Sequence, residues 1–127
     1  MGTADTLREL YQRFGQGDMA GVLALCADDI TFTVPGKSPL AGSYTKETFV
    51  PGLITSVMQR SAGTFREDVV DILAGDSHAA AYLTHSFQRD GKPVEYRTIH
   101  LWGVRDGKFS SWQEYPDDLH AFDAAWS

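Results

Sequence analysis

The chain has 127 residues, 43% of them apolar and 22% charged, which indicates one globular domain over residues 1–127 and excludes a disordered or fibrous chain. Its net charge is −6, from 17 acidic and 11 basic residues, and this argues against nucleic acid or an anionic membrane surface as a partner. No apolar run approaches the roughly 20 residues of a membrane-spanning helix, and the N-terminus lacks the apolar core of a signal peptide, so a cytoplasmic protein is expected.

Helical patterns dominate the first half of the chain. Apolar residues recur at i, i+3, i+4 and i+7 between residues 3 and 14, which predicts a helix with one side packed on a core. Asp18 caps a second, short helix, whose apolar side includes Cys26 as a buried residue rather than a nucleophile. Cys26 is the only cysteine, so no internal disulfide forms. Residues 30–34 alternate like a strand, and residues 46–60 show a third helical pattern.

Strand patterns separated by short turns follow residue 63. The four predicted strands cover residues 65–73, 79–88, 94–104 and 109–115. Two of the turns are Asp-Gly pairs, which are among the strongest hairpin signals, so an antiparallel meander is expected. Residues 117–127 predict a last short helix with an aspartate cap. The order α-α-β-α-β-β-β-β, with the helices at one end of a curved sheet, is an α+β architecture.

The hairpin at residues 90–91 decides which side chains share a face. A two-residue turn pairs Arg89 with Lys92, so alternate residues of both strands point to one side, which is the predicted pocket. Its predicted residues are Leu83, His85, Phe87, Tyr96, Thr98, His100 and Trp102, with Trp112 from the last strand and Leu10, Phe14, Phe32, Val34, Phe49 and Leu53 from the opposite wall. In this register the levels of His85 and His100 differ by about 13 Å, so no shared metal ion and no other cofactor is predicted.

Five short motifs, spread over nearly the whole chain, carry a family resemblance. They cover residues 14–18, 24–32, 35–36, 40–42 and 100–108. In this order and spacing they make the chain similar to the nuclear-transport-factor-2-like superfamily, in its ketosteroid-isomerase and polyketide-cyclase-like (SnoaL-like) branch. The resemblance implies a cone-shaped, curved antiparallel sheet of the cystatin-like type, wrapped by the N-terminal helices around an apolar pocket for flat ligands. It also implies a homodimer through the outer sheet face, where Ile99 and Leu101 are expected.

The resemblance does not extend to steroid isomerisation. Ketosteroid isomerases use a carboxylate base at the end of the first strand, a tyrosine from the first helix and a neutral acid on a late strand. The matching positions here hold Val34, Leu10 and His100. Tyr11 is adjacent to Leu10, but a helix turns about 100° per residue, so this tyrosine is expected to point elsewhere.

The resemblance to polyketide cyclases implies an acidic residue on the last strand and a histidine on the strand before it, which are Glu114 and His100. Whether they share a face depends on the hairpin at residues 106–107. A two-residue turn sends Glu114 to the opposite face, whereas a three-residue turn with a bulge at Gly107 places it opposite Thr98, beside His100. The residues permit both, and we expect the second because the resemblance requires it.

These residues predict a cofactor-independent enzyme in which Glu114 and His100 move a proton on a carbon beside a carbonyl of a flat, hydrophobic small molecule. The alternative is a non-catalytic protein that binds such a molecule against Trp102 and Trp112. Epoxide hydrolysis is a third hypothesis. In that branch an Asp-Arg-Asp arrangement activates water, and the late strand here offers only Arg97 and His100.

Overall fold

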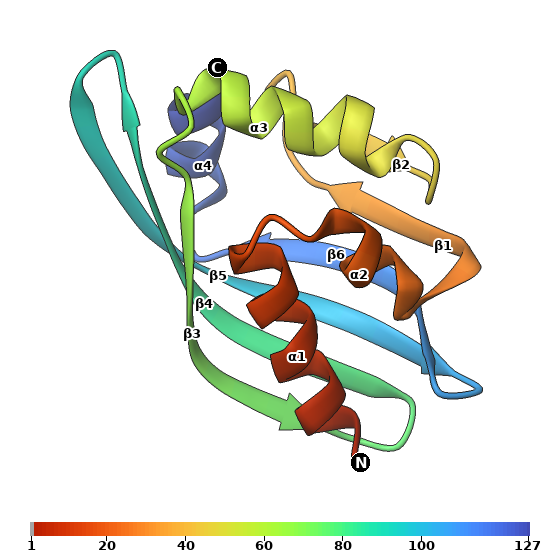
Figure 1. Ribbon diagram of the computed structural model, residues 1–127. Helices are drawn as coiled ribbons and strands as arrows, with labels where there is room; N and C mark the ends of the chain where they lie inside the picture. Colours follow the sequence, from red (N-terminus) through yellow and green to blue (C-terminus); the bar gives the residue numbers. More distant parts are fainter. Residues whose placement is uncertain (1) are drawn as a thin grey trace.

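A computed structural model describes residues 2–127 (Figure 1). Its elements, in chain order, are α1 (Thr3–Gly15), α2 (Met19–Ala24), β1 (Cys26–Val34), β2 (Gly42–Tyr44), the π-helical turn η1 (Phe49–Ile54), α3 (Thr55–Arg60), β3 (Arg66–Ala74), β4 (His78–Arg89), β5 (Lys92–Arg105), β6 (Lys108–Pro116) and α4 (Leu119–Trp126). None of the described helices is both long and apolar enough to cross a membrane.

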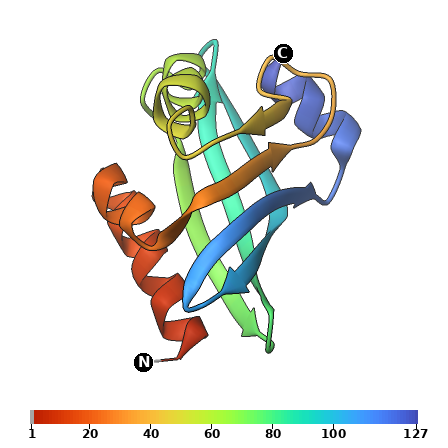
Figure 2. The same cartoon turned by 90° about the vertical axis from the view of Figure 1, so that its right-hand side faces the viewer.

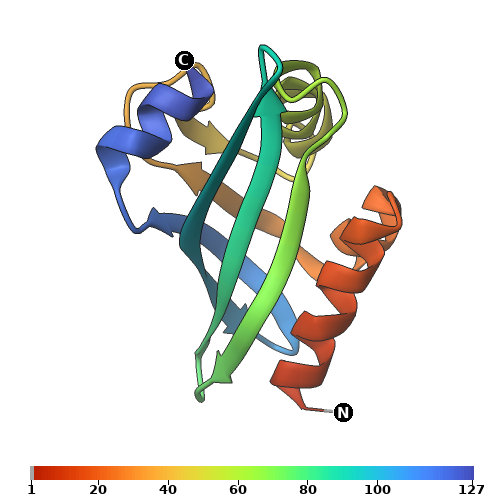
Figure 3. The same ribbon diagram turned by 90° about the vertical axis from the view of Figure 1, so that its left-hand side faces the viewer.

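The six strands form one curved sheet in the order β2-β1-β6-β5-β4-β3. Strands β3 to β6 form the predicted antiparallel meander, and β1 joins its β6 edge in parallel. The sheet curls so that α1 and α3 lie along its concave side, as Figures 2 and 3 show from opposite directions. The α+β fold with a curved sheet wrapped by helices is therefore confirmed, and the helices enclose space on its concave side.

Three local features differ from the predictions. The second helix ends early, because β1 begins at Cys26 and not at residue 30. Cys26 is buried at the start of this strand, and burial raises the pKa of its thiol to about 11, so it stays protonated and unreactive near neutral pH. The short strand β2 was not predicted, since three residues are too few to show alternation. Pro51 lies inside the π-helical turn η1 of the third predicted helix.

Two hairpins fix the register of the pocket strands. The turn at residues 90–91 pairs Arg89 with Lys92, as predicted. The turn at residues 106–107 is also a two-residue turn, with positive φ at both positions, so the predicted three-residue turn is wrong. One extra residue in β6, Ser110, forms a bulge that shifts the register again, and Glu114 comes to lie directly opposite His100. The two side chains share a face because of this bulge and not because of the turn.

Candidate functional site

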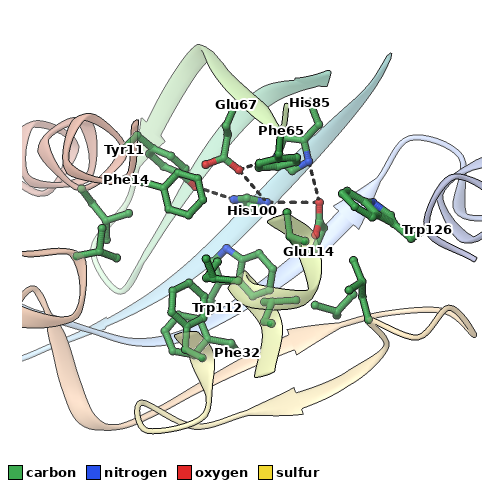
Figure 4. A pocket seen from close by; sticks show the side chains of 18 of the residues that line it. Tyr11, Phe14, Phe32, Phe65, Glu67, His85, His100, Trp112, Glu114 and Trp126 are labelled. Carbon is green, nitrogen blue, oxygen red and sulfur yellow. Dashed lines mark hydrogen bonds and ion pairs between the residues drawn. The ribbon is translucent and has the colours of Figure 1, made fainter. Parts of the chain in front are cut away.

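A cavity of about 70 Å³ lies on the concave face of the sheet (Figure 4). Its walls are apolar except for the hydroxyls of Tyr11 and Tyr96 and a cluster of two carboxyl and two imidazole side chains, Glu67, His85, His100 and Glu114. A cavity of this size holds a few water molecules and is smaller than the roughly 300 Å³ of a typical pocket for a drug-sized ligand. A ligand of several rings therefore has to push lining side chains aside, and Phe14, Ile54 and Phe65 are the half-buried ones around the cavity.

Most residues that the sequence placed in the pocket do line it. These are Leu10, Phe14, Phe32, Val34, Phe49, Leu53, His85, Tyr96, His100, Trp102, Trp112 and Glu114. Leu83, Phe87 and Thr98 were also predicted to line it and do not. They are buried in the layer around the cavity, where Phe87 stacks on Trp126 with ring centroids 4.2 Å apart. Arg97, the residue of the epoxide hydrolysis hypothesis, is exposed and donates a hydrogen bond to the Tyr82 hydroxyl, so the pocket lacks an arginine.

Other lining residues were missed. They are Tyr11, Val22, Leu40, Ile54, Val57, Phe65, Glu67, Phe122 and Trp126. The expectation that Tyr11 points elsewhere is wrong, because the buried stripe of an amphipathic helix is wide enough to include both Leu10 and its neighbour. The i, i+3, i+4, i+7 spacing was the signal that could have placed Tyr11 in the pocket.

Glu67 had no comparable signal. It faces His85 only because the β3–β4 register shifts by one residue between Val69 and Asp71. Without that irregularity the neighbouring carboxylate, Asp68, would lie opposite His85 and Glu67 would point to the other face. Two bulges, one in β3 and one in β6, therefore turn both glutamates of the site inward.

Glu114 and His100 are buried opposite each other on β6 and β5, with exposed fractions of 6% and 4%. Glu114 Oε2 lies 3.4 Å from His100 Nε2 and accepts a 3.0 Å hydrogen bond from the Thr98 hydroxyl. Burial by itself would raise the pKa of Glu114, but the two imidazoles and Thr98 favour the charged form more strongly. The pKa of Glu114 therefore lies below its ordinary value, and the side chain is a carboxylate near neutral pH.

His85 forms the second polar contact of the cluster. Its Nε2 lies 2.6 Å from Glu67 Oε2, and its Nδ1 lies 3.0 Å from the Tyr96 hydroxyl. Burial lowers the pKa of His85, but the hydrogen bond and charge of Glu67 and the charge of Glu114 outweigh burial, so its pKa is raised. The environment of Glu114 thus favours the carboxylate, and that of His85 makes its imidazole a stronger proton acceptor than it is in water.

Each histidine belongs to a chain of tryptophan, tyrosine, histidine and glutamate. The Trp102 indole donates to the Tyr11 hydroxyl at 3.0 Å, and this hydroxyl lies 2.7 Å from His100 Nδ1. In the second chain the Trp126 indole donates to Tyr96 at 2.9 Å. Burial raises the pKa of both tyrosines, so both keep their protons.

An indole N–H only donates, so each tyrosine oxygen accepts from a tryptophan. The only other hydrogen-bond partner of each buried hydroxyl among the described residues is the histidine Nδ1, so the hydroxyl proton has an acceptor only when it points to Nδ1 of the neutral ring. The neutral rings of His85 and His100 therefore carry their proton on Nε2, facing the glutamates. Among the described residues, His100 Nε2 has no partner with hydrogen-bond geometry. It is a buried N–H donor that a ligand oxygen in the cavity can satisfy.

The predicted separation of the histidines, and the argument against a shared metal ion that rested on it, are wrong. The registers were right, with Ala81 opposite His100, yet the two rings lie only 5.4 Å apart. The flat-strand estimate fails because side chains on the concave face of a curved sheet converge. In the described chain, Glu67, His85 and His100 offer three ligand atoms within 4.8 Å of one another.

The hydrogen-bond direction, however, does not suit a metal ion. A metal-bound histidine needs a lone pair on the nitrogen that faces the metal and donates its other N–H outward. Here the tyrosines donate to Nδ1, which leaves the proton on the nitrogen that faces the cluster. The arrangement fits proton transfer better than metal binding.

The charge state of Glu114 predicts a pH effect on stability. The pKa of Glu114 is lower in the folded protein than its ordinary value of 4.5, so the ionised side chain stabilises the fold. This stabilisation is fully present above pH 4.5 and is lost as the pH falls through the folded-state pKa. The difference in unfolding free energy between wild type and Glu114→Gln should therefore shrink as the pH is lowered below 4.5 in urea titrations. The exposed Glu95→Gln is the control and should show no such trend. Parallel curves for the two variants would contradict the assignment.

Known proteins match the chain over most of its length. The family model of the SnoaL-like domain matches residues 7–112. The uncharacterized protein Rv0034 of Mycobacterium tuberculosis is 27% identical over 124 residues, which are 97% of this chain and 95% of that protein. An NTF2-like protein of unknown function from Burkholderia pseudomallei superposes with a TM-score of 0.87 at 21% identity, covering 100% of this chain and 99% of that one. TerC, co-crystallised with polyporic acid, gives a TM-score of 0.82 at 19% identity and 97% coverage of both chains.

Proposed function

Because the chain belongs to the SnoaL-like domain family of the NTF2-like superfamily, we propose that it is a cofactor-independent acid/base enzyme acting on a flat, hydrophobic small molecule with a carbonyl group. The observation that carries the proposal is the contact between Glu114 Oε2 and His100 Nε2, 3.4 Å apart and buried in a mostly apolar cavity. Family membership alone does not fix the chemistry, so the argument rests on this contact.

The proposed step is the removal of a proton from a carbon next to the carbonyl. Glu114 Oε2 takes the proton, the C–H electron pair forms a carbon–carbon double bond, and the carbonyl π electrons move to the oxygen. The Nε2–H of His100 donates to that oxygen as its negative charge develops, and Tyr11 holds the required tautomer. Return of the proton to the same or to a conjugated carbon completes the reaction.

Substrate binding also strengthens the base. The lowered pKa of Glu114 depends in part on His100. When the His100 N–H turns to the substrate oxygen, that contribution weakens and the pKa of Glu114 rises toward that of a better proton acceptor. The apolar lining excludes water, so these charges interact more strongly than in solution.

The experiment that tests the proposal follows hydrogen exchange on a model ketone. 2-Tetralone is a flat two-ring ketone with C–H groups on both sides of its carbonyl, and its deuterium uptake in D2O is measured by NMR. The protein should accelerate uptake above the buffer rate in proportion to its concentration. Absence of acceleration for this ketone and for a set of one- and two-ring ketones would reject the proposed chemistry.

A non-catalytic binding protein is the second candidate. It is favoured by the lining, which is apolar outside the four-residue cluster, and TerC, which has the same fold, was crystallised with polyporic acid. This candidate predicts binding of flat ligands that depends on Trp102 and Trp112, no hydrogen exchange on the ketone, and no effect of Glu114→Gln beyond affinity.

We also propose a homodimer through the outer face of the sheet. Ile99 and Tyr115 are opposite each other on β5 and β6 and are 41% and 48% exposed, so they form an apolar pair on that face, beside the half-buried Leu101. Sedimentation at micromolar concentration should give twice the 14.0 kDa chain mass, and Ile99→Lys should give the monomer. Val70→Lys, at another exposed apolar residue, is the matched control. A wild-type monomer at this concentration would contradict the dimer.

A further inference from the structure

His85 lies between the two buried carboxylates of the site. Its Nε2 is 2.6 Å from Glu67 Oε2, and its Nδ1 is 3.6 Å from Glu114 Oε2 (Figure 4). Both glutamate side chains and the imidazole are at most 8% exposed. An imidazole can take up a proton at one nitrogen and release one from the other, so this placement is suited to carrying protons from one carboxylate to the other.

Glu67 borders a second, outer groove that Glu114 does not reach. A groove of about 220 Å³ lies between α1 and β3, and its lining is Arg8, Tyr11, Gln12, Glu67 and Val69. Arg8 and Gln12 are exposed, so the groove is open to solvent. Glu67 lines both this groove and the inner cavity, whereas Glu114 lines only the inner cavity. Its carboxylate thus lies at the boundary between solvent and the buried cluster.

We propose that Glu114, His85 and Glu67 form a proton relay that connects the reacting carbon with solvent in the groove between α1 and β3. The relay rests on the proposed function, because it carries away the proton that Glu114 takes from the substrate and brings one back for the return step. It adds to that function a catalytic role for Glu67 and His85, and it implies that the hydrogen returned to the substrate comes from water.

The proton balance of the relay is as follows. Glu114, protonated by the substrate, passes its proton to His85 Nδ1, while the Tyr96 hydroxyl rotates its own proton away from Nδ1 and accepts from the new Nδ1–H instead. This transfer frees the Glu114 carboxylate. The imidazolium then releases its Nε2 proton to Glu67, and Glu67 releases it to water in the groove. When the product is protonated the same steps run in reverse, so His85 regains its Nε2 proton and the site returns to its starting state.

The surroundings of His85 favour this direction of transfer. In the neutral ring, Tyr96 donates to Nδ1 and directs the Nε2 proton toward Glu67. The groups that face the ring are Glu67 from β3, Phe65 just before this strand, Tyr96 and His100 from β5, and Glu114 from β6. The two charged partners among them are carboxylates, which stabilise the imidazolium that forms in mid-transfer, and its raised pKa agrees with this.

The relay can be tested without a substrate, through the exchange of the His85 ring N–H with water. Saturation transfer from water on ¹⁵N-labelled protein measures this rate. Glu67→Gln keeps the size and the acceptor oxygen but cannot take a proton, so the rate should fall roughly 100-fold or more, the lower range of positioned acid/base assistance. Asp68→Asn is the matched control on the same strand, since Asp68 is exposed, and it should leave the rate unchanged.

A second variant keeps the relay testable if Glu67→Gln fails to fold. Gln12→Phe changes an exposed position on α1 and fills the groove without replacing any residue of the cluster, so it should also slow the exchange. An unchanged rate in either folded variant overturns the relay. A loss of exchange in Tyr11→Phe alone also overturns it, because the path would then run through His100.

The outcomes separate the relay from the proposed function. If ring exchange depends on Glu67 but the protein never accelerates deuterium uptake by 2-tetralone, the proton path stands and the proposed chemistry fails. If deuterium uptake by 2-tetralone depends on Glu114 but the exchange rate of the His85 ring N–H is the same in Glu67→Gln, the proposed chemistry stands and the relay fails.

Discussion

Glu114→Gln should lower the rate of deuterium uptake by 2-tetralone by about 10²- to 10⁴-fold, the usual contribution of a positioned acid/base group. Glutamine has nearly the same shape and can still accept the Thr98 hydrogen bond, but it cannot take the substrate proton. Ligand affinity should change little, because the apolar lining is intact. Affinity is measured by titration with 2-naphthol, a flat phenol that resembles the enol of 2-tetralone.

The matched control for this prediction is Glu95→Gln, the same change on an exposed residue of β5, which should keep wild-type exchange. A Glu114→Gln protein with undiminished exchange would exclude Glu114 as the base. A protein that loses affinity and exchange in the same proportion would indicate that Glu114 only helps to hold the ligand.

Tyr11→Phe should lower the free energy of unfolding by about 2–4 kcal/mol in urea or guanidinium titrations. The ring that packs in the core is kept, and only the hydroxyl is lost. The Trp102 indole N–H and His100 Nδ1 both bond to that hydroxyl inside the core. Each buried polar group left without a partner costs about 1–3 kcal/mol.

The control for Tyr11→Phe is Tyr115→Phe, which removes a hydroxyl from a side chain that is 48% exposed. Its effect should stay within about 0.5 kcal/mol, as for most surface changes. Equal stability of the two variants would show that the Tyr11 hydroxyl is not a buried link between Trp102 and His100. The inference that Tyr11 donates to His100 Nδ1, and so keeps the His100 proton on Nε2, would then be wrong.

Local patterns were enough to predict the helices and strands of this fold, with the exception of the short strand β2. The spacing of Leu7, Leu10, Tyr11 and Phe14 indicated α1, and the Asp-Gly turn at residues 90–91 set the β4–β5 register correctly. Both signals depend on neighbours in the sequence, through helix periodicity and turn geometry. The pocket walls were predicted well for the same reason, since strand alternation assigns a face once the turn is known.

The composition of the cluster of Glu67, His85, His100 and Glu114 could not be predicted in the same way. Two one-residue irregularities, near Val70 in β3 and at Ser110 in β6, decide that Glu67 and Glu114 face inward. Nothing in the side chains around them marks a bulge, and each bulge reverses the face of the residues on one side of it relative to those on the other side. The contact between His85 and His100 depends on sheet curvature, a tertiary property that strand spacing along the chain does not contain.

The most direct test of the acid/base account is a crystal structure of the protein with bound 2-naphthol. The account predicts the phenol oxygen within hydrogen-bond distance of His100 Nε2, with Glu114 over the neighbouring ring carbon and the half-buried Phe14 and Phe65 displaced to admit the two rings. A phenol oxygen directed away from His100, with Glu114 still paired to the imidazole and out of reach of the ring, would contradict catalysis by this pair.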